Sequence, residues 1–146
     1  MKKTFSILLG TALAGIVSTP QAANIGSKAP QLQIEHWVKG KPVDLAKADD
    51  KKIHIIEFWA TWCGPCRDSI PHLTKLQEKY KGKGVTVIGI TDEPKATVER
   101  FVRRQKKQME YTVAIEKGDA MSQAYMRAFG QTGIPATFVV DQQDRI

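Results

Sequence analysis

The sequence contains little cysteine and no long apolar run. Only two of its 146 residues are cysteines, Cys63 and Cys66, and both lie in one short segment. The most apolar stretch, Phe5 to Val17, is shorter than the roughly 20 residues that span a bilayer as a helix, so a permanent membrane anchor is the weaker interpretation. Internal repeats and low-complexity tracts are also missing. The roughly 120 residues that follow position 23 suit one domain with one core, which we expect to be a monomer.

The first residues are ordered like a secretory signal peptide. Lys2 and Lys3 precede the apolar stretch, and small residues ending at Ala23 follow it. Export signals show this order of charged, apolar and small residues. We expect residues 1–23 to be a signal peptide, cleaved after Ala22 or Ala23, and the protein to be exported to the periplasm or another extracytoplasmic space. Without cleavage, the leader would tether the protein to the membrane.

Basic residues are concentrated in one segment, between Glu99 and Gln108. Its apolar residues fall on one face of a helix, and its basic residues occupy the others. This distribution is typical of a solvent-exposed helix face, and we prefer that interpretation to a docking surface for nucleic acid or an anionic membrane. Export would also remove the usual nucleic-acid partners, so we expect none.

The spacing of the two cysteines favours a bond that is made and broken. A disulfide stabilises most when it closes a long loop, and a Cys-x-x-Cys pair closes one of the shortest. A structural zinc site usually takes four ligands from two such pairs, and this chain has one. His36 and His54 have no ligand spacing, and His72 fits the surface of the helix that follows the pair. We expect no metal site, and transient copper(I) binding by the bare pair is the alternative.

Cys63 is expected at the junction between a strand and a helix. The apolar run from Ile53 to Ala60 is typical of a buried strand, and the residues from Cys66 to Tyr80 have helical spacing. Gly64 permits a tight approach, and Pro65 suits the first turn of a helix, where a missing N–H costs nothing. Unpaired N–H groups at the start of the helix would then face the Cys63 sulfur and favour its thiolate, the reactive form.

Cys66 lies about one helical turn further along the chain, on the same face as Cys63 and more covered. This arrangement assigns the attack to Cys63, while Cys66 waits. Pro71 stands inside the helical pattern, where it either kinks the helix or marks the point at which the helix starts again.

The rest of the chain alternates between strands and helices. Asp92 and Glu93 precede a proline and are interpreted as caps of the next helix rather than as a catalytic acid pair. Met121, Tyr125 and Phe129 have ordinary core spacing in a helix that ends at a glycine. Alternation of this kind predicts an α/β sheet covered on both faces. The expected elements are strands at residues 85–91 and 111–115 and a helix at residues 119–130.

Two segments resemble the signatures of thioredoxins. FWATWCGPC, at residues 58–66, is similar to the thioredoxin active-site motif, and GIPATFVVD, at residues 133–141, is similar to the loop that carries a cis proline opposite the catalytic pair. Residues 25–45 resemble the N-terminal extension of exported disulfide reductases of the TlpA and ResA type. An extra strand and helix near residues 85–109 agrees with that subgroup. The resemblance implies a thioredoxin-like fold, with a central mixed sheet flanked by helices, the N-terminal extension and the inserted strand and helix.

That resemblance also implies catalytic roles. Cys63 would be the exposed nucleophile and Cys66 the resolving thiol. Pro135 would be the cis proline, a conformation that costs an X–Pro bond little. Glu57 takes the place of the buried acid, usually an aspartate, that thioredoxins put beneath the resolving cysteine. Burial should raise the pKa of Glu57 and let it exchange a proton with Cys66, unless it is a strand-end residue that reaches solvent.

Substrate binding is implied for the residues beside the sulfurs. Backbone groups of Ile134, next to Gly133, would pair with an extended segment of a substrate protein. Trp62 would form part of the docking surface, together with Gly64 and Pro65.

The implied function is that of an extracytoplasmic thiol:disulfide oxidoreductase with no cofactor beyond the redox-active pair. Gly64-Pro65 is the dipeptide of reducing members, so we expect a reductase of protein disulfides that is recharged by a membrane-embedded thiol electron donor. Cytochrome c maturation, repair of mis-oxidised proteins and a developmental role all remain open. One alternative is a metal or apo-cytochrome chaperone that holds cargo through the same pair. Another is a peroxiredoxin-like antioxidant, although the Pro-x-x-x-Thr/Ser-x-x-Cys pattern is missing, because Thr61 stands two residues before Cys63.

The last residues depart from the thioredoxin pattern. FVVDQQDRI, at residues 138–146, predicts a strand, a turn and the first apolar residue of a returning strand. Thioredoxin-like folds complete that hairpin and add a helix. We therefore expect residues 24–146 to form a C-terminally incomplete thioredoxin-like domain, in which the missing strand and helix leave a bare sheet edge and an uncovered apolar face.

Overall fold

The computed structural model describes residues 23–45 and 52–146 of the chain. The expected signal peptide lies outside the described residues except for Ala23. Within the described ranges, no helix is long and apolar enough to cross a membrane. The elements in chain order are β1 (Ile34–Lys39), β2 (Ile53–Phe58), α1 (Gly64–Tyr80), β3 (Val85–Thr91), α2 (Lys95–Gln105), the 3₁₀ turn η2 (Lys106–Gln108), β4 (Thr112–Glu116), the π-helix η3 (Ser122–Arg127) and β5 (Ala136–Val140).

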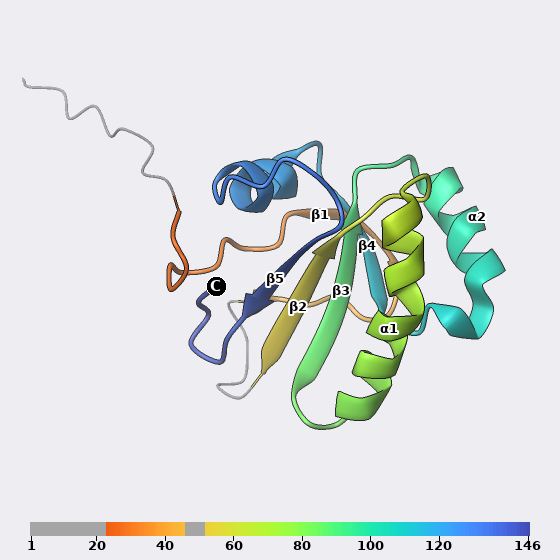
Figure 1. Ribbon diagram of the computed structural model, residues 1–146, viewed down its shortest axis with the longest axis horizontal. Coiled ribbons are helices and arrows are strands. Elements are labelled where there is room, and N and C mark those ends of the chain that lie inside the picture. Colours follow the sequence, from red (N-terminus) through yellow and green to blue (C-terminus); the bar gives the residue numbers. More distant parts are fainter. Residues whose placement is uncertain (1–22, 46–51) are drawn as a thin grey trace, which may run out of the picture.

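The strands form one mixed sheet in the order β1-β4-β3-β2-β5. Strands β2, β3 and β4 run parallel, while β1 and β5 pair antiparallel at the two edges. Helices α1 and α2 cover one face of the sheet and η3 covers the other (Figure 1). The predicted α/β arrangement, a mixed sheet flanked by helices, is confirmed.

Each face of the sheet packs against its own apolar core. Between the sheet and η3, the rings of Phe58, Tyr125 and Phe138 lie with their centroids 5.4 to 6.1 Å apart. Met121 is fully buried with them, which confirms the predicted core spacing of this segment. On the opposite face, Ile70 of α1 is buried against side chains of β3 and β4. The two cores hold α1 and η3 firmly on either side of the carboxyl ends of the parallel strands.

We expected an α-helix over residues 119–130, but the structure has the π-helix η3 at residues 122–127. The Ala128 N–H donates to the carbonyl of Gln123, five residues earlier, at 3.3 Å. Apolar spacing over so few turns does not distinguish the two helix types, so the sequence predicted the commoner one. Gly130 ends the segment as predicted, with a φ of +68° that glycine adopts without strain.

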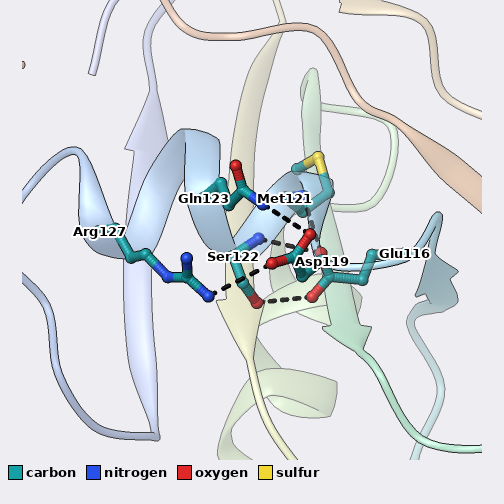
Figure 2. Close-up of polar contacts among 6 residues, drawn as sticks. All are labelled: Glu116, Asp119, Met121, Ser122, Gln123 and Arg127. Carbon is teal, nitrogen blue, oxygen red and sulfur yellow. Dashed lines mark hydrogen bonds and ion pairs between the residues drawn. The ribbon is translucent and has the colours of Figure 1, made fainter. Parts of the chain in front are cut away.

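A buried carboxylate fixes the start of η3. Glu116, the last residue of β4, accepts hydrogen bonds from the Met121 N–H at 2.7 Å and from the N–H and hydroxyl of Ser122 at 3.0 and 2.6 Å (Figure 2). On the exposed side of the same turn, Asp119 accepts from the Gln123 side chain at 2.7 Å. The start of η3 is therefore set by the last residue of β4, at the carboxyl ends of the parallel strands, where the cysteines also lie.

Two expectations about the other helices are resolved. Helix α1 runs without a break from Gly64 to Tyr80, so it does not start again at Pro71. Helix α2 begins after Pro94 with no hydrogen bond from a capping side chain, so the interpretation of Asp92 and Glu93 as caps is wrong. The Glu93 carboxylate bonds to the loop before Cys63 instead, and is therefore not free to cap α2.

β5 forms one edge of the described sheet, and Val139 in this strand is 52% exposed. After a turn, the chain returns to the segment that precedes β1. There the Ile146 N–H donates to the Ser27 carbonyl at 3.0 Å, and Arg145 pairs with Lys28. The expected lack of a C-terminal strand and helix in residues 24–146 stays a prediction.

Candidate active site

Cys63 and Cys66 form a disulfide at the junction of β2 and α1, with their sulfur atoms 2.04 Å apart. Cys63 is the N-cap residue of α1, and the Cys66 N–H donates to its sulfur at 3.2 Å. Gly64 and Pro65 occupy the first helical positions. The predicted strand-to-helix junction is confirmed. Both cysteines are buried, with Cys66 0% and Cys63 5% exposed, so the expectation that Cys63 would be exposed is wrong for the disulfide form, in which both residues pack into the core beside α1.

This position suits a thiolate once the pair is reduced. The N–H groups in the first turn of α1 have no carbonyl partner within the helix, and together with the helix dipole they place positive potential at the Cys63 sulfur. Such potential lowers the pKa of a thiol and raises the share of its nucleophilic form. Cys66, one turn further along the helix, is fully covered.

The fold brings the second signature to the sulfurs. The Ile134–Pro135 peptide bond is cis, the conformation that the resemblance implied, and the Ile134 carbonyl oxygen lies 3.8 Å from the Cys63 sulfur. Gly133 and Pro135 are exposed, and Trp62 is 73% exposed. Groups that a polypeptide can reach therefore surround a sulfur that is itself nearly buried.

Glu57 is buried within the sheet and does not reach solvent. It lies on β2 between β3 and β5, and it is 2% exposed. Its carboxylate accepts a hydrogen bond from the Thr137 hydroxyl. The Ser69 hydroxyl lies 3.4 Å from the Glu57 carboxylate and 2.7 Å from the Cys66 carbonyl. It has one proton, so it can donate to only one of these two acceptors at a time. Burial raises the pKa of Glu57, and the bonds from Thr137 and Ser69 oppose part of that rise.

Trp59 belongs to the core beneath the site. Its side chain is 3% exposed, and its ring centroid lies 5.4 Å from that of Phe101 on α2. A Cβ atom at Gly89 of β3 would lie 3.0 Å from Trp59 Nε1, so glycine is what lets the indole pack against the strand. Trp59 thus joins the active-site loop to both β3 and α2.

Glu93 is a site residue whose role the sequence did not reveal. One of its carboxylate oxygens accepts from the Thr61 N–H at 2.6 Å, and the other accepts from the Thr61 hydroxyl at 2.7 Å. Thr61 stands two residues before Cys63, so this contact ties the active-site loop to the end of β3. Nothing in the local pattern around Glu93 pointed to a partner so far away in the chain.

A cleft of about 450 Å³ opens beside Trp62 and Ile134. Its far wall is formed by Glu116 and Ser122, the pair that fixes the start of η3. Glu116 was also missed at the sequence level, where a lone acidic residue at a strand end carries no distinctive signal. The other residues lining the cleft are Phe58, Trp59, Ala60, Ile90, Thr91, Asp92, Met126, Thr132 and Gly133.

The three histidines stay apart from the cysteine pair. His36 lies on β1, His54 is buried in β2, and His72 is exposed on α1. Across residues 23–45 and 52–146, no three His, Cys, Asp or Glu side chains gather where they could hold a metal ion.

Sequence comparison places the chain among known proteins. The family described as the AhpC/TSA family matches residues 25–146. The thiol-disulfide oxidoreductase ResA of Bacillus cereus is 31% identical over 137 residues, which cover 93% of this chain and 75% of the relative. The chain belongs to the AhpC/TSA family and is a thiol-disulfide oxidoreductase of the ResA type. Its Cys63–Cys66 pair, at the start of α1, supplies the dithiol that this chemistry needs.

Solved structures agree with this membership. A thiol:disulfide interchange protein of the thioredoxin family from Chlorobium tepidum superposes with a TM-score of 0.69 at 30% identity, covering 86% of this chain and 85% of the other. A thiol:disulfide interchange protein from a Bacteroides species has a TM-score of 0.71, covers 86% of this chain and 80% of the other, and at 23% identity shows the shared fold. The predicted thioredoxin-like fold and thiol-disulfide oxidoreductase activity of this AhpC/TSA family member are confirmed.

Proposed function

We propose that this oxidoreductase works outside the cytoplasm as a reductant of protein disulfides, with no cofactor beyond Cys63 and Cys66. The observation that carries the proposal is the position of the Cys63 sulfur, at the N-terminus of α1 and 3.8 Å from the Ile134 carbonyl, with Cys66 covered behind it. One sulfur is placed to attack and the other to release the product.

In the proposed reaction, the Cys63 thiolate attacks one sulfur of the substrate disulfide. The substrate S–S bond breaks, its second sulfur leaves and takes a proton, and a Cys63–substrate mixed disulfide forms. Cys66 then gives up its proton and attacks the Cys63 sulfur, which releases the first substrate sulfur as a second thiol. Two electrons have passed to the substrate, and the protein is left with the Cys63–Cys66 disulfide. Glu57 would accept the Cys66 proton in this scheme; its burial on β2 and its contact with Ser69, whose hydroxyl also bonds to the Cys66 carbonyl, support that role.

Substrate docking is proposed at the exposed groups around Cys63. The backbone of Ile134, between Gly133 and Pro135, would pair with an extended segment of the substrate, as a strand is added to a sheet edge. The exposed ring of Trp62 would cover apolar side chains of that segment, beside Gly64 and Pro65.

The direction and location are part of the proposal. Gly64-Pro65 is the dipeptide of reducing members of the thioredoxin family, which favours reduction of substrates. The order of charged, apolar and small residues in positions 1–23 favours export, and a reductase in an oxidising compartment needs recharging. We therefore assign a membrane-embedded thiol protein as the electron donor.

Purified reduced protein tests this proposal. It should reduce a disulfide-linked peptide, and Cys63→Ser should abolish that reduction. Cys66→Ser should instead trap a one-to-one mixed disulfide with the peptide, detectable by mass spectrometry. A reduction potential more negative than roughly −200 mV supports a reductase, and a value near −120 mV would reverse the direction. Stoichiometric copper(I) binding without peptide reduction would favour the chaperone.

A further inference from the structure

A second cleft, of about 540 Å³, lies on the other side of the active-site loop and is lined by three arginines. Arg67 comes from α1, while Arg100 and Arg104 come from α2. These two α2 residues are four positions apart and therefore share one face of the helix. The cleft is completed by Thr61, Thr97, Phe101 and Gln105.

The three guanidinium groups are not neutralised within the described protein. No carboxylate in residues 23–45 or 52–146 forms an ion pair with them. The acidic residue of the same helix, Glu99, pairs with Lys95 at 4.0 Å and with Arg103 at 3.9 Å, which lie outside the cleft. Three guanidinium groups without an ion-pair partner therefore line one concave surface, although the Glu93 carboxylate lies at its wall, bonded to Thr61.

Two residues that line this cleft lie next to the cysteine pair in the chain. Thr61 stands two residues before Cys63, and Arg67 directly follows Cys66, with its N–H donating to the Cys63 carbonyl at 3.1 Å. Phe101, in the middle of α2, packs on Trp59 beneath the loop. A polypeptide whose disulfide reaches the Cys63 sulfur has the cleft within reach of the residues that flank its cysteine.

We propose that this cleft binds acidic side chains next to the disulfide of the substrate protein, an inference that rests on the proposed function. Guanidinium groups form paired hydrogen bonds with carboxylates, and unpaired arginines at a rim raise the rate at which oppositely charged partners associate. A polypeptide fits better than an anionic membrane, because the charges line a hollow beside the sulfurs. A flat lipid surface would use Lys95 and Arg103 equally.

Two disulfide peptides test the proposal, identical except that either Glu or Gln flanks the cysteines. The rate at which each peptide oxidises the reduced protein is followed by tryptophan fluorescence at low ionic strength. The Glu peptide should react roughly tenfold faster than the Gln peptide, and salt should reduce that ratio. Arg100→Gln with Arg104→Gln should bring the ratio below twofold. The matched control, Lys95→Gln with Arg103→Gln, removes the same charge from the same helix and should keep it.

Equal rates for the two peptides with the wild-type protein would overturn the proposal, as would an equal loss of the ratio in the control variant. Failure of the wild-type protein to react with the Gln peptide would count against the proposed function instead. Binding of a cysteine-free Glu-rich peptide to the oxidised protein, measured by fluorescence anisotropy, tests the cleft without turnover and should weaken about tenfold in the Arg100/Arg104 variant. Binding to anionic lipid vesicles that this variant loses, with no peptide preference, would assign the cleft to a membrane and contradict the proposal.

Discussion

The Thr61 N–H lies 2.6 Å from one carboxylate oxygen of Glu93, and the Thr61 hydroxyl lies 2.7 Å from the other, although 32 residues separate the two in the chain. Both hydrogen bonds end on an ionised acceptor, so they are stronger than neutral ones. Through them, the loop that carries Cys63 is held to the carboxyl end of β3. The position of the sulfur therefore depends on a residue outside both signature motifs.

Replacing Glu93 should loosen this loop. Glu93→Ala leaves the Thr61 N–H and hydroxyl without their acceptor, and we expect a loss of about 1–3 kcal/mol in the free energy of unfolding. Alkylation of Cys63 in the reduced protein should slow at the same time, because the sulfur is held less firmly against the start of α1. Urea denaturation and iodoacetamide kinetics measure the two effects.

Glu99→Ala is the control for this loop. Glu99 makes only surface ion pairs on α2, which contribute about 0–1 kcal/mol, so this variant should stay close to the wild-type protein. If Glu93→Ala and Glu99→Ala behave alike, Glu93 does not hold the loop.

Burial of Glu57 makes the stability of the protein depend on pH. Its folded pKa is raised above the unfolded value of 4.5, so its contribution to stability is fully present below pH 4.5 and is lost as the pH rises through the folded pKa. Glu57→Gln removes this loss. We expect the variant to be more stable than the wild-type protein at pH 7, and the difference to shrink toward pH 4. Urea denaturation of the oxidised protein at both values measures this, and a gain that does not vary with pH would contradict it.

Burial of His54 should make the stability of the protein fall at low pH, the opposite of the effect of Glu57. Burial and, secondarily, Lys52 lower its pKa below the unfolded value of 6.5, while Asp144 opposes them. Neither ring nitrogen has a hydrogen-bond partner in the described part of the chain. The unfolded chain therefore takes up a proton first, and stability falls as the pH drops below 6.5.

The variant His54→Leu keeps the side-chain volume and removes the titrating ring. We expect it to exceed the wild-type protein by about 1–3 kcal/mol at pH 8, because two unpaired buried nitrogens are removed, and by more at pH 5. Thermal or urea unfolding across this range measures the difference. If the difference in stability between His54→Leu and the wild-type protein is the same at both pH values, the pKa of His54 does not change on unfolding.

Much of the site was predictable from the sequence because its signals are local. The boundaries of β3 fall at Val85 and Thr91 as expected, since a continuous apolar run carries its own limits. Gly64 and Pro65 indicated the start of α1, because proline suits the first turn of a helix, and this placed Cys63 at the junction.

The contacts around the sulfurs were not predictable, because they join segments that only the folded sheet brings together. Glu93 precedes a proline, as a helix-capping residue often does. In the folded protein its carboxylate bonds to Thr61 instead of to the start of α2. Arg100 and Arg104 looked like part of an ordinary outer helix face. Only the packing of α2 beside α1 sets them across a cleft from Arg67.

The most direct test of the account is the alkylation of the fully reduced protein as a function of pH, with the modified cysteine identified by mass spectrometry. Cys63 should react first and reach half of its maximal rate well below pH 8.5, the ordinary pKa of a thiol, while Cys66 stays protected. Equally slow modification of both sulfurs at neutral pH would contradict it.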